Sequence, residues 1–243
     1  MNSNINKFNE KSEFYNKYRP KYSEELINYI VSSINKNDII ADIGCGTGIF
    51  TKQLVEKNCN VIGIEPNKEM YEKARKNLPE IRLINATAEN TTLDSNSVDV
   101  ITIAQALHWF NIEEFTKEAK RILKQDGRIA IIYNSIDDSK EIIKEFKQIH
   151  KMYCKQYNNH NRNLNELFES VFKEDYTLSN YYNNQRYTFE EFIGYSFSLS
   201  YSLREDDEKY KEYVECLEKL FNKYENNGFI ELPMLSKLAF GKI

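Results

Sequence analysis

The chain has 243 residues and a mass of 28.8 kDa, and its 33 Lys and Arg residues nearly balance its 37 Asp and Glu residues, for a formal net charge of −4. The two signs are interspersed along the sequence, so composition argues against a nucleic-acid or membrane partner. The four cysteines are far apart, which excludes a disulfide framework and a zinc-like spacing. The first residues lack the apolar core of a signal peptide, and no segment approaches the ~18 apolar residues of a membrane span. We therefore expect a cytoplasmic α/β domain without a metal.

Helices and strands are expected to alternate along the first part of the chain. Ser23, Asn67 and Asn111 stand at N-cap positions, and Glu114 follows Asn111 at the spacing of a capping box. Most expected strands are apolar on both faces, which indicates a parallel sheet covered by helices on each side. The expected helices cover residues 22–35, 48–58, 67–78 and 112–124, and the expected strands cover residues 38–44, 60–65, 81–85, 98–107 and 128–134.

The alternation stops after Asn134. Residues 137–175 and 189–224 have helical patterns rich in Tyr and Phe, and we expect a helical cap there. Residues 176–188 and 231–243 alternate and contain β-formers, which predicts a closing antiparallel pair of strands. The Asn-rich stretch within residues 157–165 is expected to be a loop. His150 and His160 fall in this polar region and are expected to be solvated.

A glycine-rich turn lies between the first strand and the helix that follows it. Gly44, Gly46 and Gly48 give the spacing G-x-G-x-G, whereas a dinucleotide-binding fingerprint needs glycine at the position of Ile49. A phosphate-binding P-loop also fails, because no Gly-Lys-Ser/Thr follows. Such a turn brings backbone amides close to a ligand, so a nucleotide-like ligand is expected here.

Two acids refine this expectation. Asp42 lies two residues before the first glycine, where it would repel a pyrophosphate and favour a cation. Glu65 lies 23 residues after Asp42 at the tip of the next strand, where an acid binds ribose hydroxyls. The turn is therefore expected to hold a phosphate-free nucleoside that carries positive charge, a description that S-adenosylmethionine meets.

Five ordered segments between residues 38 and 134 resemble the motifs of class I S-adenosylmethionine-dependent methyltransferases: ADIGCGTG, GIEPNKEM, ATAENTTL, SVDVITIAQALHWF and ILKQDGRIAII. YNKYRPKYSEEL, SLSYS and AFGK look like the branch that contains trans-aconitate methyltransferases. The resemblance implies a Rossmann-like, doubly wound, mostly parallel seven-stranded sheet with a closing antiparallel strand pair and a helical cap. It also implies one methyltransferase domain, divided into an N-terminal cofactor-covering segment with a helix (1–37), a cofactor-binding core (38–134), a cap with a late strand (135–224) and a closing strand (225–243).

The resemblance assigns a role in cofactor binding to residues at the carboxyl edge of the sheet. The glycine turn would hold the methionyl end near Asp42, Glu65 would bind the ribose, and Arg19 would pair with the methionyl carboxylate. Many relatives carry Asp at the position of Thr87, so a charged contact to the adenine amine is replaced here by a hydroxyl or a carbonyl. The implied residues are Tyr15, Tyr18, Arg19, Asp42, Gly44, Cys45, Gly46, Glu65, Pro66, Met70, Thr87, Ala88, Glu89, Ala104 and Gln105.

The acceptor site is expected beside the fourth strand. His108 is a candidate general base, or a hydrogen-bonded wall residue. Trp109 and Phe110 either line an apolar wall or belong to the core. Tyr15 and Tyr18 either cover the cofactor or are packing aromatics, and the two interpretations are equally good. Asp99 is interpreted as a structural acid at the edge of a strand and not as a catalytic one. Arg186 and Arg204 would either meet a carboxylate acceptor or lie on the surface. The expected substrate-binding residues are His108, Trp109, Tyr195, Ser200 and Tyr201.

Together these features predict an enzyme that transfers a methyl group from S-adenosylmethionine by in-line displacement, leaving S-adenosylhomocysteine. The acceptor is expected to be an oxygen, nitrogen or carboxylate of a small molecule, bound by a monomer or homodimer. A non-catalytic S-adenosylmethionine-binding protein and a nicotinamide-dependent oxidoreductase are the alternatives, and Ile49 and Asp42 argue against the second.

Overall fold

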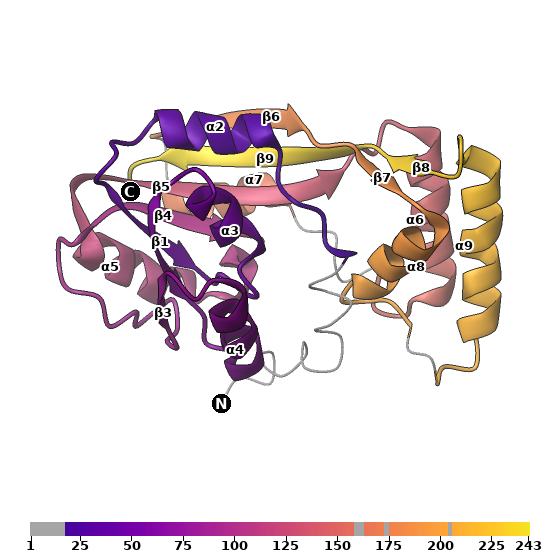
Figure 1. The fold of residues 1–243 in the computed structure, drawn as a ribbon, viewed down its shortest axis with the longest axis horizontal. Helices are drawn as coiled ribbons and strands as arrows, with labels where there is room; N and C mark the ends of the chain where they lie inside the picture. The colour runs from indigo at the N-terminus through magenta and orange to yellow at the C-terminus, as the bar shows by residue number, and fades with distance from the viewer. Residues whose placement is uncertain (1–17, 158–162, 173–174, 204–205) are drawn as a thin grey trace.

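The computed structural model describes residues 18–157, 163–172, 175–203 and 206–243. A large sheet with helices on both faces occupies one end of the molecule, and helices α6, α8 and α9 lie together at the other end (Figure 1). The two ends are joined by the long strands of the sheet. No helix within these described ranges is long and apolar enough to cross a bilayer.

The sheet has seven strands in the order β3-β2-β1-β4-β5-β9-β6. The first five strands run parallel, and β9 is antiparallel to both of its neighbours. The predicted fold class, with its closing antiparallel strands, is confirmed. The strands are β1 (Ile39–Ile43), β2 (Asn60–Ile64), β3 (Arg82–Ile84), β4 (Val98–Ala104), β5 (Leu123–Ile136), β6 (Tyr176–Tyr182) and β9 (Met234–Gly241).

Strand ends differ from the expected ones at two places that matter for the site. The fourth strand ends at Ala104 instead of residue 107, because Gln105 has a φ of +58° and the chain turns into the short 3-10 helix η2 (Leu107–Trp109). The fifth strand extends to Ile136, because it pairs with β9 over eight consecutive residues. Both changes bring polar and aromatic side chains to the carboxyl edge of the sheet.

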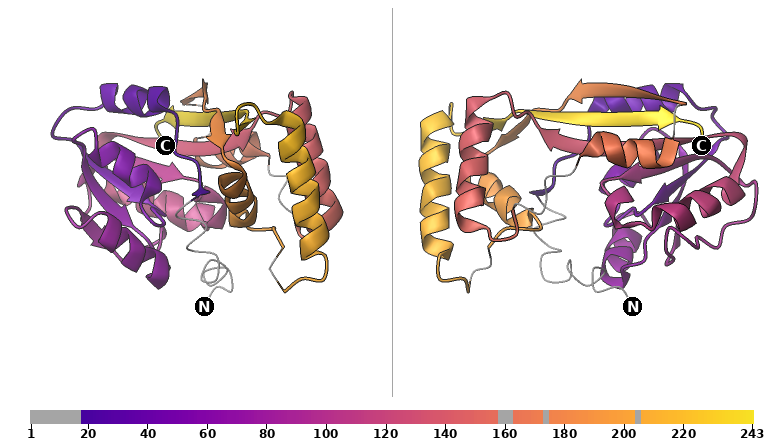
Figure 2. Two further views of the ribbon diagram at one scale, coloured as in Figure 1. Left: turned by 45° about the vertical axis from the view of Figure 1, so that its right-hand side comes forward. Right: turned by 180° about the vertical axis from the view of Figure 1, so that it is seen from behind.

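Helices cover the two faces of the sheet (Figure 2), and they pack apolar side chains against it. On one face, α2 and α3 pack their buried residues against β1, β4 and β5. On the other face, α5 and α7 pack against the same strands, with Phe115 and Phe168 fully or almost fully buried. The helices are α2 (Glu24–Ser32), α3 (Ile49–Val55), α4 (Lys68–Asn77), α5 (Ile112–Ile122) and α7 (Leu164–Phe172).

The predicted helix caps take different forms. Asn67 accepts a hydrogen bond from the Met70 N–H at 3.0 Å, as expected. Asn111 accepts from the Glu114 N–H, but its own N–H donates to Glu89 instead of completing a capping box. Ser23 occupies the N-cap position of α2 without a side-chain cap, and its N–H donates to Ser236. Spacing along the sequence thus predicted where these helices begin, whereas tertiary contacts determine the hydrogen-bond partners of the N-cap residues.

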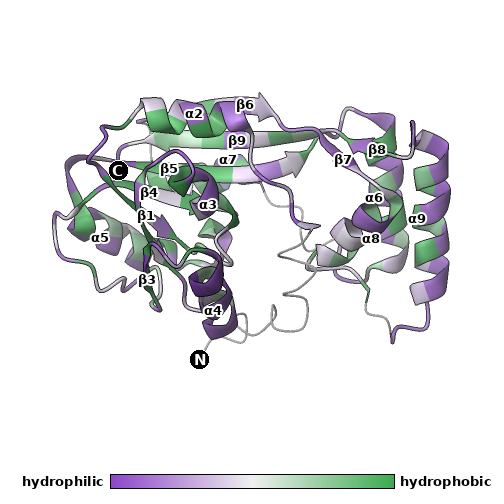
Figure 3. Cartoon of the chain, viewed as in Figure 1, coloured by the Kyte–Doolittle hydropathy of each residue, from purple (hydrophilic) through white to green (hydrophobic). Residues whose placement is uncertain are grey.

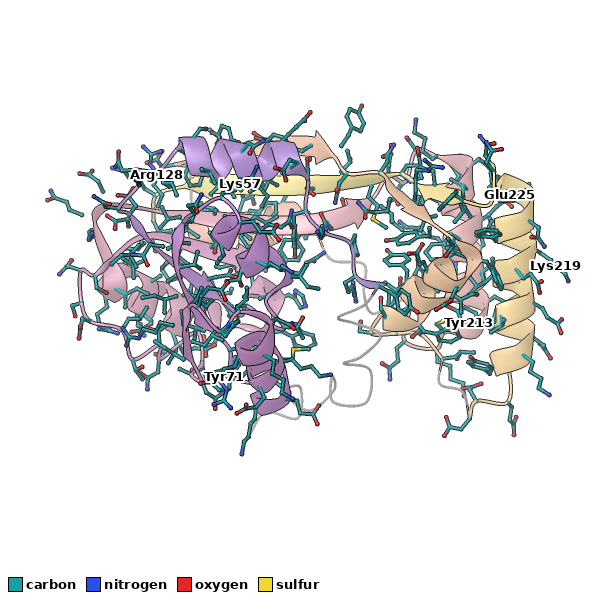
Figure 4. The ribbon with its side chains drawn as sticks, viewed as in Figure 1. Lys57, Tyr71, Arg128, Tyr213, Lys219 and Glu225 are labelled. Carbon is teal, nitrogen blue, oxygen red and sulfur yellow. The ribbon has the colours of Figure 1, made fainter. Side chains whose placement is uncertain are left out.

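The cap is a separate aromatic core beside the sheet. Its helices are α6 (Glu141–Tyr153), α8 (Phe189–Ser198) and α9 (Tyr210–Tyr224), closed by the small antiparallel pair β7 (Gln185–Tyr187) and β8 (Ile230–Leu232). Figure 3 shows hydrophobic and hydrophilic stretches alternating along α9, as expected for a helix with one buried face. Tyr213 points from α9 toward α6 and α8, whereas the exposed Lys219 extends away from them (Figure 4).

The prediction that His150 is solvated is wrong. His150 is fully buried on α6, where its Nδ1 lies 2.8 Å from the Phe146 carbonyl oxygen and its Nε2 lies 3.0 Å from the Tyr213 hydroxyl. Burial lowers its pKa to about 4. The polar composition of the region concealed this core, because its buried members are mainly Tyr and Phe on separate helices. His160 lies outside the described residues.

Candidate active site

The glycine turn is held in a left-handed conformation at the carboxyl ends of β1 and β2. Gly44 has a φ of +74°, and a Cβ there would lie 2.5 Å from the Cβ of Ala106, so the turn packs directly onto the segment after β4. Gly46 has a φ of +60°, and only the Met70 sulfur, at 4.0 Å, lies near the position of its absent Cβ. The first glycine therefore serves packing, while the second leaves space beside Met70 on α4.

Glu65 closes the turn from the tip of β2. One carboxylate oxygen accepts the Gly46 N–H at 2.8 Å, and the other accepts the Asn67 N–H at 2.8 Å. Burial outweighs these bonds and raises the pKa of Glu65 to about 7. Each carboxylate oxygen can accept a second hydrogen bond, so two vicinal hydroxyls fit the remaining positions.

Asp42 lies behind the turn instead of lining a cavity. Its two carboxylate oxygens accept hydrogen bonds from the hydroxyls of Thr51 at 2.5 Å and Thr102 at 2.8 Å, and the side chain is fully buried. Burial raises its pKa to about 6. Asp42 is thus a buried acid next to the glycine turn, and it ties the end of β1 to α3 and β4 through the two threonines.

A first cavity opens at the carboxyl ends of β1 and β4. Six of the residues expected at the cofactor line it: Arg19, Gly44, Cys45, Gly46, Ala104 and Gln105. Thr47, which the sequence did not single out, also lines the cavity. Its hydroxyl is buried and has no hydrogen-bond partner among the described residues, so a polar ligand atom would satisfy it.

The remaining expected cofactor residues lie on the β2 and β3 side of the turn. Met70 is buried next to Gly46, and Pro66 accepts a side-chain hydrogen bond from Asn85 through its carbonyl. Ala88 is buried, while Thr87 is exposed. Glu89 accepts the Asn111 N–H at 2.9 Å and so ties this side to the segment that carries η2.

A second, larger cavity of about 650 Å³ lies between the sheet edge and the cap. It shares three lining residues with the first cavity: Arg19, Gln105 and Asn134. All five residues expected at the acceptor, from two distant parts of the chain, line this one cavity: His108, Trp109, Tyr195, Ser200 and Tyr201.

The structure separates Trp109 from Phe110. Trp109 lines the cavity, with its ring centroid 4.8 Å from that of His108. Phe110 instead packs into the sheet core against Phe115, with ring centroids 5.2 Å apart. Because η2 is a tight turn, adjacent residues face opposite environments. His108 is held by Tyr133, whose hydroxyl lies 3.0 Å from its Nδ1.

The segment after residue 17 crosses the edge of the sheet. Asn134 donates to the Lys21 carbonyl at 3.1 Å, and the Tyr22 N–H donates to Gln53. Arg19, which donates to the Ser198 carbonyl at 3.0 Å, is thereby placed between the two cavities. Tyr18 lines neither cavity; its ring packs onto Gly194 of the cap, and its hydroxyl donates to Glu190 at 3.1 Å. Tyr15 lies outside the described residues.

The cations that line the larger cavity differ from those expected. Arg186 lies 4.7 Å from the Phe229 ring centre and does not line the cavity, and Arg204 lies outside the described residues. Lys147, Lys237 and Arg19 line it instead. Lys147 on α6 forms an ion pair with Asp138 at 2.5 Å. No local motif marks Lys147 or Lys237, because they come together only when α6 and β9 fold against the sheet edge.

Residues 41–131 match the model of a methyltransferase domain family. An uncharacterized methyltransferase of Mycobacterium tuberculosis is 33% identical over 135 residues, which cover 56% of this chain and 55% of that protein. A candidate S-adenosylmethionine-dependent methyltransferase of Saccharomyces cerevisiae is 37% identical over 136 residues, 53% of this chain and 46% of that protein. The chain therefore spans about half the length of the curated relatives that it matches.

The fold also resembles solved structures. A candidate type II methyltransferase from Anaeromyxobacter dehalogenans superposes with a TM-score of 0.65 at 19% identity, over 92% of this chain and 97% of that chain. Geranyl diphosphate C-methyltransferase from Streptomyces coelicolor, solved with S-adenosylhomocysteine, gives a TM-score of 0.51 at 12% identity, over 90% of this chain and 79% of that chain. These likenesses establish the fold, while none of them names the trans-aconitate branch, which stays a prediction.

Proposed function

We propose that this chain, which contains a class I S-adenosylmethionine-dependent methyltransferase domain, transfers a methyl group to a small-molecule acceptor bound in the cap-side cavity. The observation that carries this proposal is the junction of the two cavities at Arg19, Gln105 and Asn134. A donor in the first cavity and an acceptor in the second would meet at these residues. An in-line displacement requires such an end-to-end arrangement.

The residues that line the first cavity, together with Glu65 and Met70 beside the glycine turn, fit S-adenosylmethionine. Glu65 has acceptor positions for both ribose hydroxyls, and the space beside Gly46 lies next to Met70, where a flat base would pack. The buried Thr47 hydroxyl and Arg19 are suited to the methionyl ammonium and carboxylate, respectively. We assign Pro66, Thr87, Ala88 and Glu89 to the adenine side.

Methyl transfer from a positively charged sulfur requires mainly that the protein align the reacting groups. S-adenosylmethionine supplies a methyl group on a positively charged sulfur. The fixed edge formed by Ala104 and Gln105 would orient that group toward the larger cavity, where Trp109 and Tyr201 provide apolar walls that exclude water. The acceptor forms a new bond to the methyl carbon while the carbon–sulfur bond breaks. Any proton of the acceptor leaves to solvent or to a nearby base.

Binding is tested first with the single tryptophan of the chain, Trp109, as a fluorescent probe. We expect S-adenosylmethionine and S-adenosylhomocysteine to change its emission saturably, because Trp109 lines the cavity adjoining the cofactor site. NAD serves as the control ligand. A saturable response to NAD alone would overturn the proposal in favour of an oxidoreductase.

Turnover is tested by incubating the protein with S-adenosylmethionine and a panel of carboxylic acids, phenols and amines. Mass spectrometry of the mixtures is expected to show an added methyl group on one class together with equal amounts of S-adenosylhomocysteine. Tight cofactor binding without product across the panel would instead favour the non-catalytic binding protein.

A further inference from the structure

Strand β6 forms one edge of the large sheet. It stands last in the strand order and pairs with β9 alone. The view from behind in Figure 2 shows it at the upper border of the sheet, above β9. An edge strand directs one row of backbone N–H and C=O groups away from the sheet, and another chain can pair with such a row. We therefore ask which partner this edge fits.

The hydrogen bonds at the two ends of β6 show which of its residues face outward. The Lys242 N–H donates to the Asp175 carbonyl at 3.1 Å, and the Asn183 N–H donates to the Met234 carbonyl at 2.8 Å. Bonded positions alternate along an antiparallel ladder, and the register with β9 is continuous between these two bonds. The odd-numbered residues therefore bond to β9, and the even-numbered residues of 176–182 direct their N–H and C=O groups outward.

The outward row is open to a partner. Within the part of the chain that the structure describes, no other segment forms backbone hydrogen bonds with the outward groups of Leu178, Asn180 or Tyr182. All three residues are exposed, and the exposed fractions of Leu178 and Tyr182 are 52% and 79%. The other face of the strand is partly covered by α2, where the Tyr29 ring centroid lies 6.3 Å from that of Tyr181. Two exposed apolar side chains thus stand beside the open backbone row.

The two edges of the sheet differ in the features that prevent an edge strand from pairing with a copy of itself. The far edge, β3, has only three residues and begins with Arg82, and short length and charge both discourage pairing. Strand β6 has seven residues, YTLSNYY, with no charged residue, no proline and no bulge against β9. Two identical copies of β6 would therefore meet without like-charge repulsion between the strands.

We propose that β6 pairs antiparallel with β6 of a second copy of this chain, about a two-fold axis at Asn180, and so joins two sheets into one. The apolar pattern of the strand favours a second copy as the partner. Leu178 and Tyr182 lie two residues on either side of Asn180, so this axis sets Leu178 of each copy opposite Tyr182 of the other. All three residues are outward-facing positions, so the same register also satisfies the backbone row.

The dimer is compatible with the proposed function but does not depend on it. No residue of β6 lines either cavity, so pairing leaves both of them open. Seven residues from each copy form a small interface, and we expect the dimer to be reversible. Its test requires neither cofactor nor acceptor, so failure of the dimer and failure of the methyltransferase proposal are separate results.

Sedimentation velocity of the full-length protein over a wide range of concentrations tests the dimer. We expect wild type to pass reversibly from monomer to dimer as its concentration rises. A wild type that stays monomeric at the highest concentration would overturn the proposal.

Two substitutions identify the edge. Leu178→Lys places a charge in the interface, and Asn180→Pro removes one outward N–H without affecting the ladder to β9. Each should weaken dimerisation by roughly tenfold, since an unfavourable cross-strand pair occurs in both halves of the interface. Met152→Lys, which changes a 70% exposed residue of α6, is the matched control and should dimerise as wild type does.

The circular dichroism spectrum shows whether each variant folds. A dimer of undiminished affinity in folded Leu178→Lys would place the interface elsewhere and overturn the proposal. If Asn180→Pro does not fold, Leu178→Lys still decides the outcome.

Disulfide trapping tests the axis. In the proposed register Asn180 faces itself, with Cα atoms about 5.5 Å apart, within the range of about 4.4–6.8 Å that a disulfide spans. Asn180→Cys should therefore form a covalent dimer under mild oxidation, while Leu178→Cys, which faces Tyr182, should form far less. Wild type, with its four native cysteines, gives the background. Trapping of Leu178→Cys in preference to Asn180→Cys would contradict the axis at Asn180.

Discussion

The cofactor edge of the sheet and the aromatic cap both bury ionisable groups, but burial shifts the pKa values of those groups in opposite directions. At the edge, burial raises the pKa of Asp42 to about 6 and that of Glu65 to about 7. In the cap, burial lowers the pKa of His150 to about 4. Burial disfavours the charged form in both regions, and the buried groups have internal hydrogen bonds in both, but a cavity lined by Gly46, whose N–H donates to Glu65, adjoins the edge, whereas both ring nitrogens of His150 have partners within the cap. The two regions therefore differ in whether a cavity adjoins the buried group, and not in whether that group has internal partners.

The largest expected effect is an opposite pH dependence of stability in the two regions. Glu65 has a raised folded pKa, so its contribution is complete below about 4.5 and is lost as pH rises through about 7. His150 has a lowered folded pKa, so its contribution is complete above about 6.5 and is lost as pH falls through about 4. Each effect is about 3 kcal/mol at its limit.

Urea unfolding of Glu65→Gln and His150→Asn, each compared with wild type at the same pH, separates these contributions. Relative to wild type, the Glu65 variant should gain stability as pH rises from 4.5 to 8, and the His150 variant as pH falls from 6.5 to 4. If the stability of both variants relative to wild type changed in the same direction with pH, the contrast between the two regions would be wrong.

Next in size is the loss of cofactor affinity in Glu65→Ala. Removal of two charge-assisted acceptor positions should weaken S-adenosylmethionine binding by about 1 to 3 kcal/mol, or roughly 5- to 150-fold. Isothermal titration calorimetry measures the effect, and Tyr213→Phe, which changes only the cap, is the matched control. Equal affinity in the Glu65 variant and wild type would remove Glu65 from the ribose site.

Tyr213→Phe should itself destabilise the protein by about 1 kcal/mol, because it removes the hydrogen bond to buried His150 Nε2. Thermal and urea unfolding measure this loss, and cofactor affinity should be unchanged. A reduced affinity in this variant would show that the cap and the cofactor edge are coupled.

The smallest effect is expected for Thr47→Val. This substitution removes a buried hydroxyl without a partner among the described residues, so the ligand-free protein should be as stable as wild type or gain up to about 1 kcal/mol. Cofactor affinity should fall a few-fold, as measured by calorimetry. A variant that loses stability and keeps full affinity would assign Thr47 to the scaffold instead of the site.

Local patterns predicted the glycine turn, the acids at the strand tips and the order of the core elements. Gly44 and Glu65 were identifiable because spacing along consecutive strands places such residues at the same edge of a parallel sheet. The burial of Asp42 could not be predicted, because its hydrogen-bond partners, the hydroxyls of Thr51 and Thr102, come from a helix and from another strand.

The acceptor side shows the same division. Aromatic and serine residues of α8 and the segment after it were expected at the cavity, and they line it together with His108. Tyr133 escaped notice because an apolar strand with one Tyr is an ordinary core pattern. Only its place in β5, where it pairs with Lys237 of β9, and its contact with η2 reveal the hydrogen bonds to His108.

The sequence by itself determined the periodicity of each element, the sharp turn after β1 and the kind of chemistry that its glycines and acids can support, because these depend on residues close together in the chain. Tertiary structure alone decided which polar groups became buried, which cations reached the cavity and which hydrogen-bond partners the histidines His108 and His150 received. Those outcomes depend on the dielectric surroundings and hydrogen-bond partners supplied by segments far apart in the sequence, as between Ser23 and Ser236, which are 213 residues apart.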